Sequence, residues 1–391
     1  MSFEKPYEGL NVVNLSQGVA GPYCGMLLGI NGAKVIKVEP LHGDWSRKLM
    51  PAYGDNTAFS VAANIGKLSI AVDVKTKIGY EIVDRLCQTA DVFLQAFRPG
   101  IIDRLGFGYE HMKKFNPGLI YVSISGFGQT GPLKDKPAMD PILQAFTGFM
   151  SENHGPDGIP HRTPNIANDM ATGLYAQQAV ASALYARRDC GRGRHIEVSL
   201  MEASANLQSI RLMSAYRDGP YQASMVPNGV FKTKDGWVQI IVLLDKDFYN
   251  FSQALGNPEL AEDTRFSSAE GRLENGATLN SLISSIIEKE TSDFWRTQLD
   301  LAGIQNEIVQ TYEQFIEHPH VSEVGLISWL TQPGSSTPWP VPNTPASPKY
   351  EVSSQSSIAP EIGHHTREIL TDLGYTSKDI DAFIANGAVS V

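Results

Sequence analysis

Hydrophobic and polar positions in the first half of the chain follow two alternating patterns. Short apolar segments rich in β-branched residues recur at residues 10–16, 33–40, 66–74, 91–97, 119–128 and 194–200. Between them lie segments typical of helices, at residues 20–32, 77–90 and 109–118 and from Asp169 to Cys190. Strands that alternate with helices predict an α/β protein with a parallel sheet covered on both faces.

The pattern changes near Pro227. Residues 228–244 predict a β-hairpin with Asp235 and Gly236 in or beside the turn. Helical segments follow at residues 245–256, 279–290 and 291–303. We therefore predict a smaller α+β domain over residues 225–325. The proline-rich residues 332–350 exclude a continuous helix or a central strand and predict an extended linker, and residues 364–389 predict two short amphipathic helices.

The composition is that of an ordinary globular protein, with 42% hydrophobic and 19% charged residues among 391. The net charge of −10 argues against broad binding of nucleic acid or acidic membranes. The start of the chain does not resemble a signal peptide, and no apolar stretch is long enough to span a bilayer. Three scattered cysteines indicate reduced thiols. These features predict a cytoplasmic protein.

Several common catalytic motifs are missing from the sequence. Gly18, Gly21 and Gly25 follow the first predicted strand, but their spacing is not that of a dinucleotide fingerprint. The nine histidines form no metal-binding motif, and no G-x-S-x-G elbow occurs. We predict no metal and no permanently bound cofactor.

Basic residues follow several predicted strands, where ligands bind to parallel sheets. They are Lys67, Lys75, Arg98, Arg104, Lys134 and Lys136. Composition alone favours solvated loop charges. The alternative is a site for a phosphorylated ligand, held by charge-assisted hydrogen bonds.

Asp169 stands at the start of the long Ala-rich helix. Aspartate is a preferred N-cap, as is the neighbouring Asn168, and residue preferences alone favour the capping role. Two features favour chemistry instead. The small Ala171, Thr172 and Gly173 leave room for a ligand, and a helix N-terminus favours the ionised carboxylate that a nucleophile needs.

The order of segments resembles the family III CoA-transferases. This group includes formyl-CoA transferase and crotonobetainyl-CoA:carnitine CoA-transferase, and its sister branch is α-methylacyl-CoA racemase. The resemblance extends over nearly the whole chain. It rests on residues 20–40, "NIGKLSIAVDVK", "DVFLQAFRPGIIDRLGFGYE", "IYVSISGFGQTGP", "PAMDPILQAFTGFMS", residues 167–203, "GVFKTKDGWVQI" and "GHHTREIL".

The resemblance implies that Asp169 is a nucleophile that forms first a mixed anhydride and then an aspartyl-CoA thioester. Acyl-CoA and a small carboxylic acid are the implied substrates. The implied CoA contacts are Val19, Ala20, Val72, Lys75, Phe97, Arg98, Arg104, Ala138, Met139 and Asp140.

The chain departs from the family pattern at Leu68, at Ala96 and at residues 303–309. The racemase remains an alternative, but that branch has a histidine where Met139 stands, and a thioether cannot exchange a proton. A non-catalytic acyl-CoA-binding homologue is the second alternative.

The resemblance also implies a Rossmann-like large domain built from both chain ends, a small inserted domain and a homodimer of interlocked rings. We expect residues 1–200 to form the first part of the large domain and residues 201–224 a linker helix. Residues 225–325 would form the small domain, and residues 326–391 the linker and the return to the large domain. The segment "SMVPNGVFKTKDGWV" lacks the glycine run of formyl-CoA transferase-like members. This predicts an acceptor larger than formate or oxalate, including a dicarboxylate paired with Lys232, Lys234 or Lys246.

Overall fold

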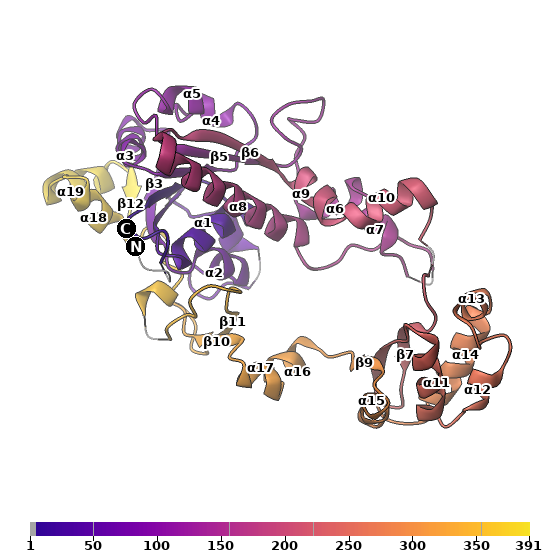
Figure 1. Cartoon of the computed structure of the whole chain (residues 1–391). Coiled ribbons are helices and arrows are strands. Elements are labelled where there is room, and N and C mark those ends of the chain that lie inside the picture. Colours follow the sequence, from indigo (N-terminus) through magenta and orange to yellow (C-terminus); the bar gives the residue numbers. More distant parts are fainter. Residues whose placement is uncertain (1–4, 50, 156, 222, 353) are drawn as a thin grey trace. The chain divides into compact units, whose positions relative to one another are not determined.

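The computed structural model describes residues 5–49, 51–155, 157–221, 223–352 and 354–391. The chain divides into two compact units (Figure 1). The large unit contains the described residues up to Met213 together with Val324–Val391. The small unit is Ser214–Glu323. The large unit is therefore assembled from both ends of the chain.

A seven-stranded sheet forms the centre of the large unit, in the order β12-β3-β2-β1-β4-β5-β6. All neighbouring strands are parallel except β12, which runs antiparallel to β3. The strands are β1 (Asn11–Asn14), β2 (Lys34–Glu39), β3 (Leu68–Val72), β4 (Val92–Gln95), β5 (Ile120–Ser125), β6 (Arg194–Ser199) and β12 (Val389–Ser390). The predicted parallel sheet is confirmed, and its order reverses between β1 and β4.

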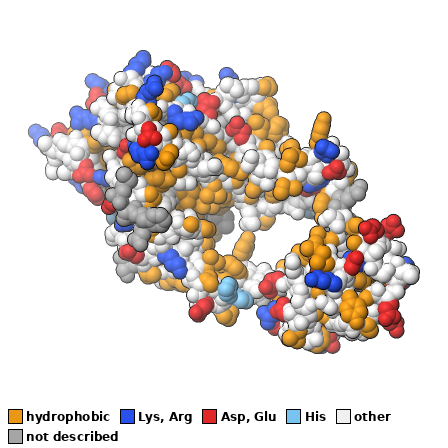
Figure 2. Space-filling model, in the orientation of Figure 1, with side chains coloured by type: hydrophobic (Ala, Val, Ile, Leu, Met, Phe, Trp, Pro, Cys, Tyr) orange, Lys and Arg blue, Asp and Glu red, His pale blue; other side chains and the backbone are white. Residues whose placement is uncertain are grey.

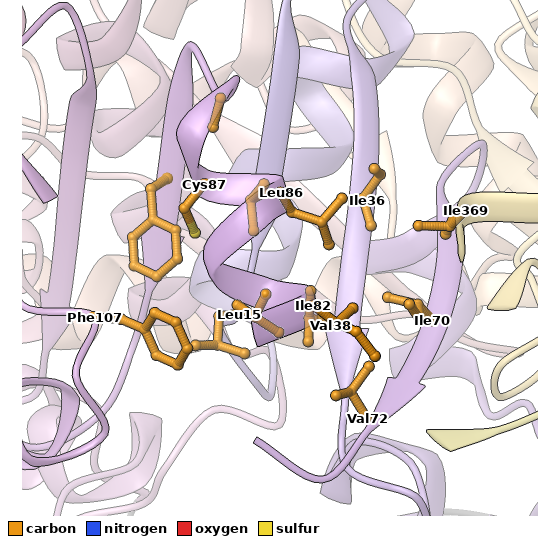
Figure 3. Packing of buried hydrophobic residues seen from close by; sticks show 14 of the residues in the cluster. Leu15, Ile36, Val38, Ile70, Val72, Ile82, Leu86, Cys87, Phe107 and Ile369 are labelled. Atoms are coloured by element: carbon orange, nitrogen blue, oxygen red, sulfur yellow. The ribbon is translucent and has the colours of Figure 1, made fainter. Parts of the chain in front are cut away.

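Helices cover both faces of this sheet because successive strand residues point to opposite sides. Val13 packs in a cluster with α3 (Lys77–Gln88), α18 (Thr366–Asp372) and α19 (Ser377–Ala385). Figure 3 shows this cluster, with Ile82 and Leu86 of α3 over Ile36 and Val38 of β2. The adjacent Val12 belongs to the opposite cluster, which contains residues of α1 (Ala20–Ile30) and α8 (Ala167–Cys190).

Shorter elements complete the large unit. They are η1 (Trp45–Lys48), α2 (Ala58–Asn64), α4 (Ile101–Arg104), α5 (Tyr109–Met112), α6 (Asp140–Phe146), α7 (Phe149–Glu152), α9 (Leu200–Leu207), α10 (Ser209–Asp218, which continues into the small unit), β10 (Ile327–Leu330), β11 (Trp339–Pro342) and η2 (Gln355–Ser357). The predicted helix at residues 109–118 was too long, since α5 ends at Met112. The linker prediction for residues 332–350 missed β11, which pairs with β10 in a two-stranded sheet where its prolines are tolerated.

The small unit contains a three-stranded antiparallel sheet in the order β7-β8-β9. The predicted hairpin is present as β7 (Asn228–Lys232) and β8 (Trp237–Ile241), with residues 233–236 between them. Sequence analysis missed β9 (Gln305–Ile308), which pairs with β8. The helices of this unit are α11 (Asp245–Ala254), α12 (Glu259–Glu262), α13 (Ala269–Glu274), α14 (Gly276–Ile287), α15 (Ser292–Leu301), α16 (Tyr312–Glu317) and α17 (Pro319–Glu323).

Charged side chains of both signs are interspersed over the face shown in Figure 2. Within the described residues, no helix combines the length and the apolar character that crossing a membrane requires.

Candidate active site

A cavity of about 760 Å³ lies at the carboxyl edge of the sheet, where the strand order reverses. Its walls come from the segments that follow β1, β4 and β5, and they include Ala20, Phe97 and Gly126. A crevice at a reversal of strand order is the usual ligand site of open α/β sheets. The volume is in the range of small-molecule and cofactor pockets.

Asp169 lines this cavity from the first turn of α8 and is half-buried. The backbone N–H of Ala20, at the start of α1, donates a hydrogen bond to its carboxylate. The two helices approach closely at Gly173, where a Cβ would lie 2.8 Å from the Ala20 carbonyl oxygen. The expectation that residues 171–173 leave room for a ligand was wrong, because Ala171, Thr172 and Gly173 are buried, and Gly173 faces α1.

The capping role proposed for Asp169 is also wrong. The N-cap position of α8 is Ile166, and the first turn is capped from another helix by Asp140 of α6. Asp140 is buried, and its Oδ2 accepts the N–H groups of Asn168 at 2.7 Å and Asp169 at 3.3 Å. Its Oδ1 accepts from Gln144 Nε2 at 2.5 Å. The Asp169 carboxylate is thus free of the capping task and faces the cavity.

Two carboxylates close together at a half-buried position change the acidity of Asp169. Burial raises the pKa of the Asp169 carboxyl to about 7, and the charge on Asp140 adds to the rise. The hydrogen bond from Ala20 N–H opposes both effects. Near neutral pH, Asp169 is therefore divided between the protonated acid and the nucleophilic carboxylate.

A buried ion pair supports the loop between β1 and α1. Asp44 Oδ2 accepts from Lys37 Nζ at 2.6 Å, and both side chains are fully buried. The Asp44 carboxylate also accepts the N–H of Gly18 at 3.0 and 3.1 Å. Gly18 has φ of +83°, and a Cβ there would collide with the Trp45 ring, so this turn requires glycine. The pair positions the loop that leads directly to Ala20.

The prediction that Lys67 is a candidate ligand cation was wrong. Lys67 Nζ is buried and donates to the Pro22 carbonyl oxygen at 2.6 Å and to Asn64 Oδ1 at 2.9 Å. Burial, followed by the nearby Lys37 charge, lowers the pKa of Lys67 well below its usual value. Lys67 thus supports the first turn of α1 and cannot reach a phosphate.

Three other cations line the cavity, namely Arg98, Lys134 and Lys136. The structure brings together several of the predicted site residues on its walls: Val19, Ala20, Phe97, Arg98, Ala138, Met139 and Asp169. Asp140 lies buried behind them. The remaining three are outside the lining: Val72 is buried in the sheet beside Val389, Lys75 lies in the loop after β3, and Arg104 is exposed on α4.

Sequence reasoning missed several lining residues, including Gln17, Trp45, Ser125 and Leu200. Gln17 and Leu200 were detectable, because each lies at or just after the end of a predicted strand. Trp45 carried no signal, since it lines the site from η1, a short helix after β2 that was not predicted. Among the described residues, no cluster of three metal-binding side chains occurs.

Comparison with known proteins identifies the class. Residues 7–366 match CoA-transferase family III, and the chain belongs to this family. It is 37% identical over 308 residues to acetyl-CoA:oxalate CoA-transferase of Acetobacter aceti, and the aligned residues cover 76% of this chain and 79% of that protein. It is 33% identical over 389 residues to succinate–glutarate CoA-transferase of Agrobacterium fabrum, covering 94% and 96% of the two chains. The structure superposes on a CAIB/BAIF family protein from Brucella suis with a TM-score of 0.85 at 31% identity, covering 95% and 100% of the two chains.

Proposed function

We propose that this CoA-transferase works through a thioester between Asp169 and CoA. The observation that carries the proposal is the half-buried Asp169 carboxylate at the wall of a cavity with three cations. Because Asp140 performs the capping, the Asp169 carboxylate is not needed as the cap of its own helix. Membership of the CoA-transferase family supplies the class of reaction.

The steps balance without a redox cofactor. An Asp169 oxygen attacks the carbonyl carbon of the donor thioester, the C–S bond breaks, and CoA thiolate leaves behind a mixed anhydride. The thiolate then attacks the Asp169 carbonyl carbon, forms the aspartyl-CoA thioester and releases the donor acid as its carboxylate. The acceptor carboxylate attacks this thioester, and the same two steps in reverse form the new acyl-CoA and restore Asp169.

The surroundings of Asp169 suit these steps. The N-cap residue of α1 makes no side-chain cap, and Ala20 and Gly21 of its first turn line the cavity. The Gly21 N–H, together with the Ala20 N–H that already donates to the Asp169 carboxylate, is placed to stabilise oxyanions that develop on that carboxyl group. Arg98, Lys134 and Lys136 suit the phosphates of CoA. Val72, Lys75 and Arg104 are further proposed contacts for the part of CoA that extends beyond the cavity.

For the acceptor we propose a carboxylic acid larger than formate or oxalate, with dicarboxylates included. The segment around Gly229 supports this, because Gly229 lies within β7 and is paired with Ile240 instead of belonging to a flexible glycine loop. The relative from Agrobacterium fabrum is named for succinate and glutarate, whereas the relative from Acetobacter aceti is named for oxalate. Oxalate is therefore the most informative comparator.

A panel of acyl-CoA donors and free acids tests the proposal, with new thioesters identified by mass spectrometry. We expect succinate-sized and larger acids to exceed oxalate and formate in kcat/KM. The same reactions with a 2-methylacyl-CoA in deuterated water test racemisation, and we expect little exchange at the α-carbon because Met139 cannot carry a proton. Oxalate as the best acceptor would contradict the size prediction, and rapid exchange would favour the racemase.

The reaction should follow the ionisation of Asp169. Only the carboxylate attacks, so kcat/KM for acyl-CoA should rise with pH and level off above about 7. Asp140→Asn removes a negative charge that raises this pKa, and the rise should move to lower pH. A Gln144→Ala variant also disturbs the cap but keeps the charge, so its profile should stay at the wild-type position. Identical profiles for Asp140→Asn and wild type would contradict the electrostatic role of Asp140.

Arg98 should contribute to CoA binding. Loss of a charged hydrogen bond costs about 1–3 kcal/mol, so Arg98→Ala should raise KM for acyl-CoA by roughly 5- to 150-fold. Arg104→Ala should do the same if CoA extends over α4, where Arg104 is exposed. Arg188→Ala is the control, because Arg188 pairs with Asp189 at the far end of α8. An unchanged KM in Arg98→Ala would remove this residue from the site.

Two expectations from the sequence remain proposals. The first is a homodimer of interlocked rings, which cross-linking and light scattering test. The second is a cytoplasmic location.

A further inference from the structure

A second cavity, of about 400 Å³, lies beside the start of α8. One wall is α2, which contributes Ala58, Phe59, Ala62 and Ala63. The other is the first turn of α8, which contributes Ile166 and Met170. None of the described residues that line it carries a charge. We call this space the alanine cavity.

The alanine cavity and the larger cavity share a lining residue, Val19, and lie close to Asp169. Asp169 lines the larger cavity, whereas its neighbour Met170 lines the alanine cavity from the same helical turn. Val19 lines both, and the next residue along the chain, Ala20, donates its N–H to Asp169. The two cavities therefore lie next to each other at the first turns of α1 and α8.

We propose that the alanine cavity binds the hydrocarbon chain of the transferred acyl group, an inference that rests on the proposed function. In an acyl-CoA, the CoA part and the acyl chain extend from opposite sides of the carbonyl that Asp169 attacks. The cations of the larger cavity suit the phosphates of CoA. The uncharged walls of the alanine cavity suit a hydrocarbon chain, which gains free energy from leaving water.

The proposal names a substrate class, namely aliphatic acyl groups of about four carbons or more, since a cavity of about 400 Å³ has far more room than an acetyl group fills. Each methylene transferred from water to such a wall improves binding by about fourfold. Acids without a hydrocarbon segment, such as formate and oxalate, leave the cavity empty. A second carboxylate at the far end of the chain would meet no cationic side chain among the described lining residues.

The first test compares acetate, butyrate and hexanoate as acceptors with one donor. In the wild type, kcat/KM should rise by about fourfold per methylene. Ala62→Phe places a ring in the cavity from an exposed position of α2, so it should fold. We expect it to lower the hexanoate-to-acetate ratio of kcat/KM by at least about tenfold. Ala62→Leu should give an intermediate ratio.

Ala186→Phe is the matched control. Ala186 is exposed on α8, about 25 Å along the helix from Asp169. This variant adds the same ring to a helix outside both cavities, so its hexanoate-to-acetate ratio should equal that of the wild type. Equal ratios in Ala62→Phe and Ala186→Phe would overturn the proposal.

A second test measures binding without turnover. Acetyl-CoA and hexanoyl-CoA are titrated into Asp169→Ala, with and without the added Ala62→Phe substitution. Hexanoyl-CoA should bind more tightly than acetyl-CoA, and Ala62→Phe should reduce this difference. Suppose that the wild type transfers CoA, but Ala62→Phe changes neither the hexanoate-to-acetate ratio of kcat/KM nor the difference in binding between hexanoyl-CoA and acetyl-CoA. Only the proposal about the alanine cavity is then refuted. If the wild type transfers CoA to no acid, the proposed function fails, and the binding measurement still decides the cavity.

Discussion

Asp169→Ala should lower kcat for CoA transfer by at least about 1,000-fold, because it removes the carboxylate on which the proposed covalent intermediate forms. Mass spectrometry of the wild type quenched during turnover should detect CoA attached to the peptide that contains Asp169, and the variant should lack this adduct. Binding of acyl-CoA should persist, since the cations of the cavity are untouched. Transfer by Asp169→Ala at rates near those of the wild type would exclude the covalent role.

A stability measurement separates this loss from unfolding. The pKa of Asp169 is about 7 in the folded protein but about 3.9 in an unfolded chain. The folded state therefore binds more protons between these pH values, and the stability of the wild type falls as pH rises through this window. Asp169→Asn has no ionisable group at this position, so it does not lose stability in this way as the pH rises. At pH 8 it should be more stable than the wild type by about 1–3 kcal/mol, and the difference should vanish near pH 4.

Asp44→Ala should lower the free energy of unfolding by about 3–5 kcal/mol, because the buried ammonium of Lys37 loses its carboxylate partner and keeps only the Ser16 carbonyl oxygen. Burial disfavours the charge on Asp44, but Lys37 and the N–H groups of Ser46 and Gly18 outweigh burial and hold the pKa of Asp44 below its usual value. This contribution to stability is present at neutral pH and is lost as the pH falls through the folded pKa. Denaturation by urea at pH 7 and in acid measures it, and the difference from the wild type should shrink in acid.

The matched control for this variant is Asp372→Ala. Asp372 pairs with Lys34 at 3.0 Å, but the side chains are 57% and 45% exposed, whereas those of Asp44 and Lys37 are fully buried. Exposed pairs contribute about 0–1 kcal/mol. If the two variants lose equal stability, the buried pair does not hold the loop as described. Asp44→Ala should also reduce transfer, because Gly18 and the adjoining start of α1 lose their support.

Most elements of the large unit were predictable because their patterns are local. Apolar β-branched segments predicted β1 to β6, and helical segments predicted α1, α3 and α8. The elements that were missed depend on distant partners. β9 is a strand because it pairs with β8, and β11 because it pairs with β10, more than eight residues away along the chain in each case.

The candidate site shows the same contrast between features set by local sequence patterns and features set by distant residues. The order of motifs in the sequence was enough to select Asp169 and to identify the family. It was not enough to decide whether Asp169 caps its helix, because the residue that does so, Asp140, lies 29 positions away. Lys67 reads as a solvated cation in the sequence, yet it is buried against Pro22, 45 positions away.

The sequence alone therefore determined the class of fold, the family and the identity of the candidate nucleophile, since these depend on local patterns and on the order of motifs along the chain. Only the tertiary structure decided which cations face the large cavity, how Asp140 and Ala20 set the acidity of Asp169, and that an uncharged cavity adjoins it. Those properties arise from burial and from distances between groups on different elements. Both quantities are defined only once the strands assemble and the N-terminal halves of α1 and α8 pack together at Gly173.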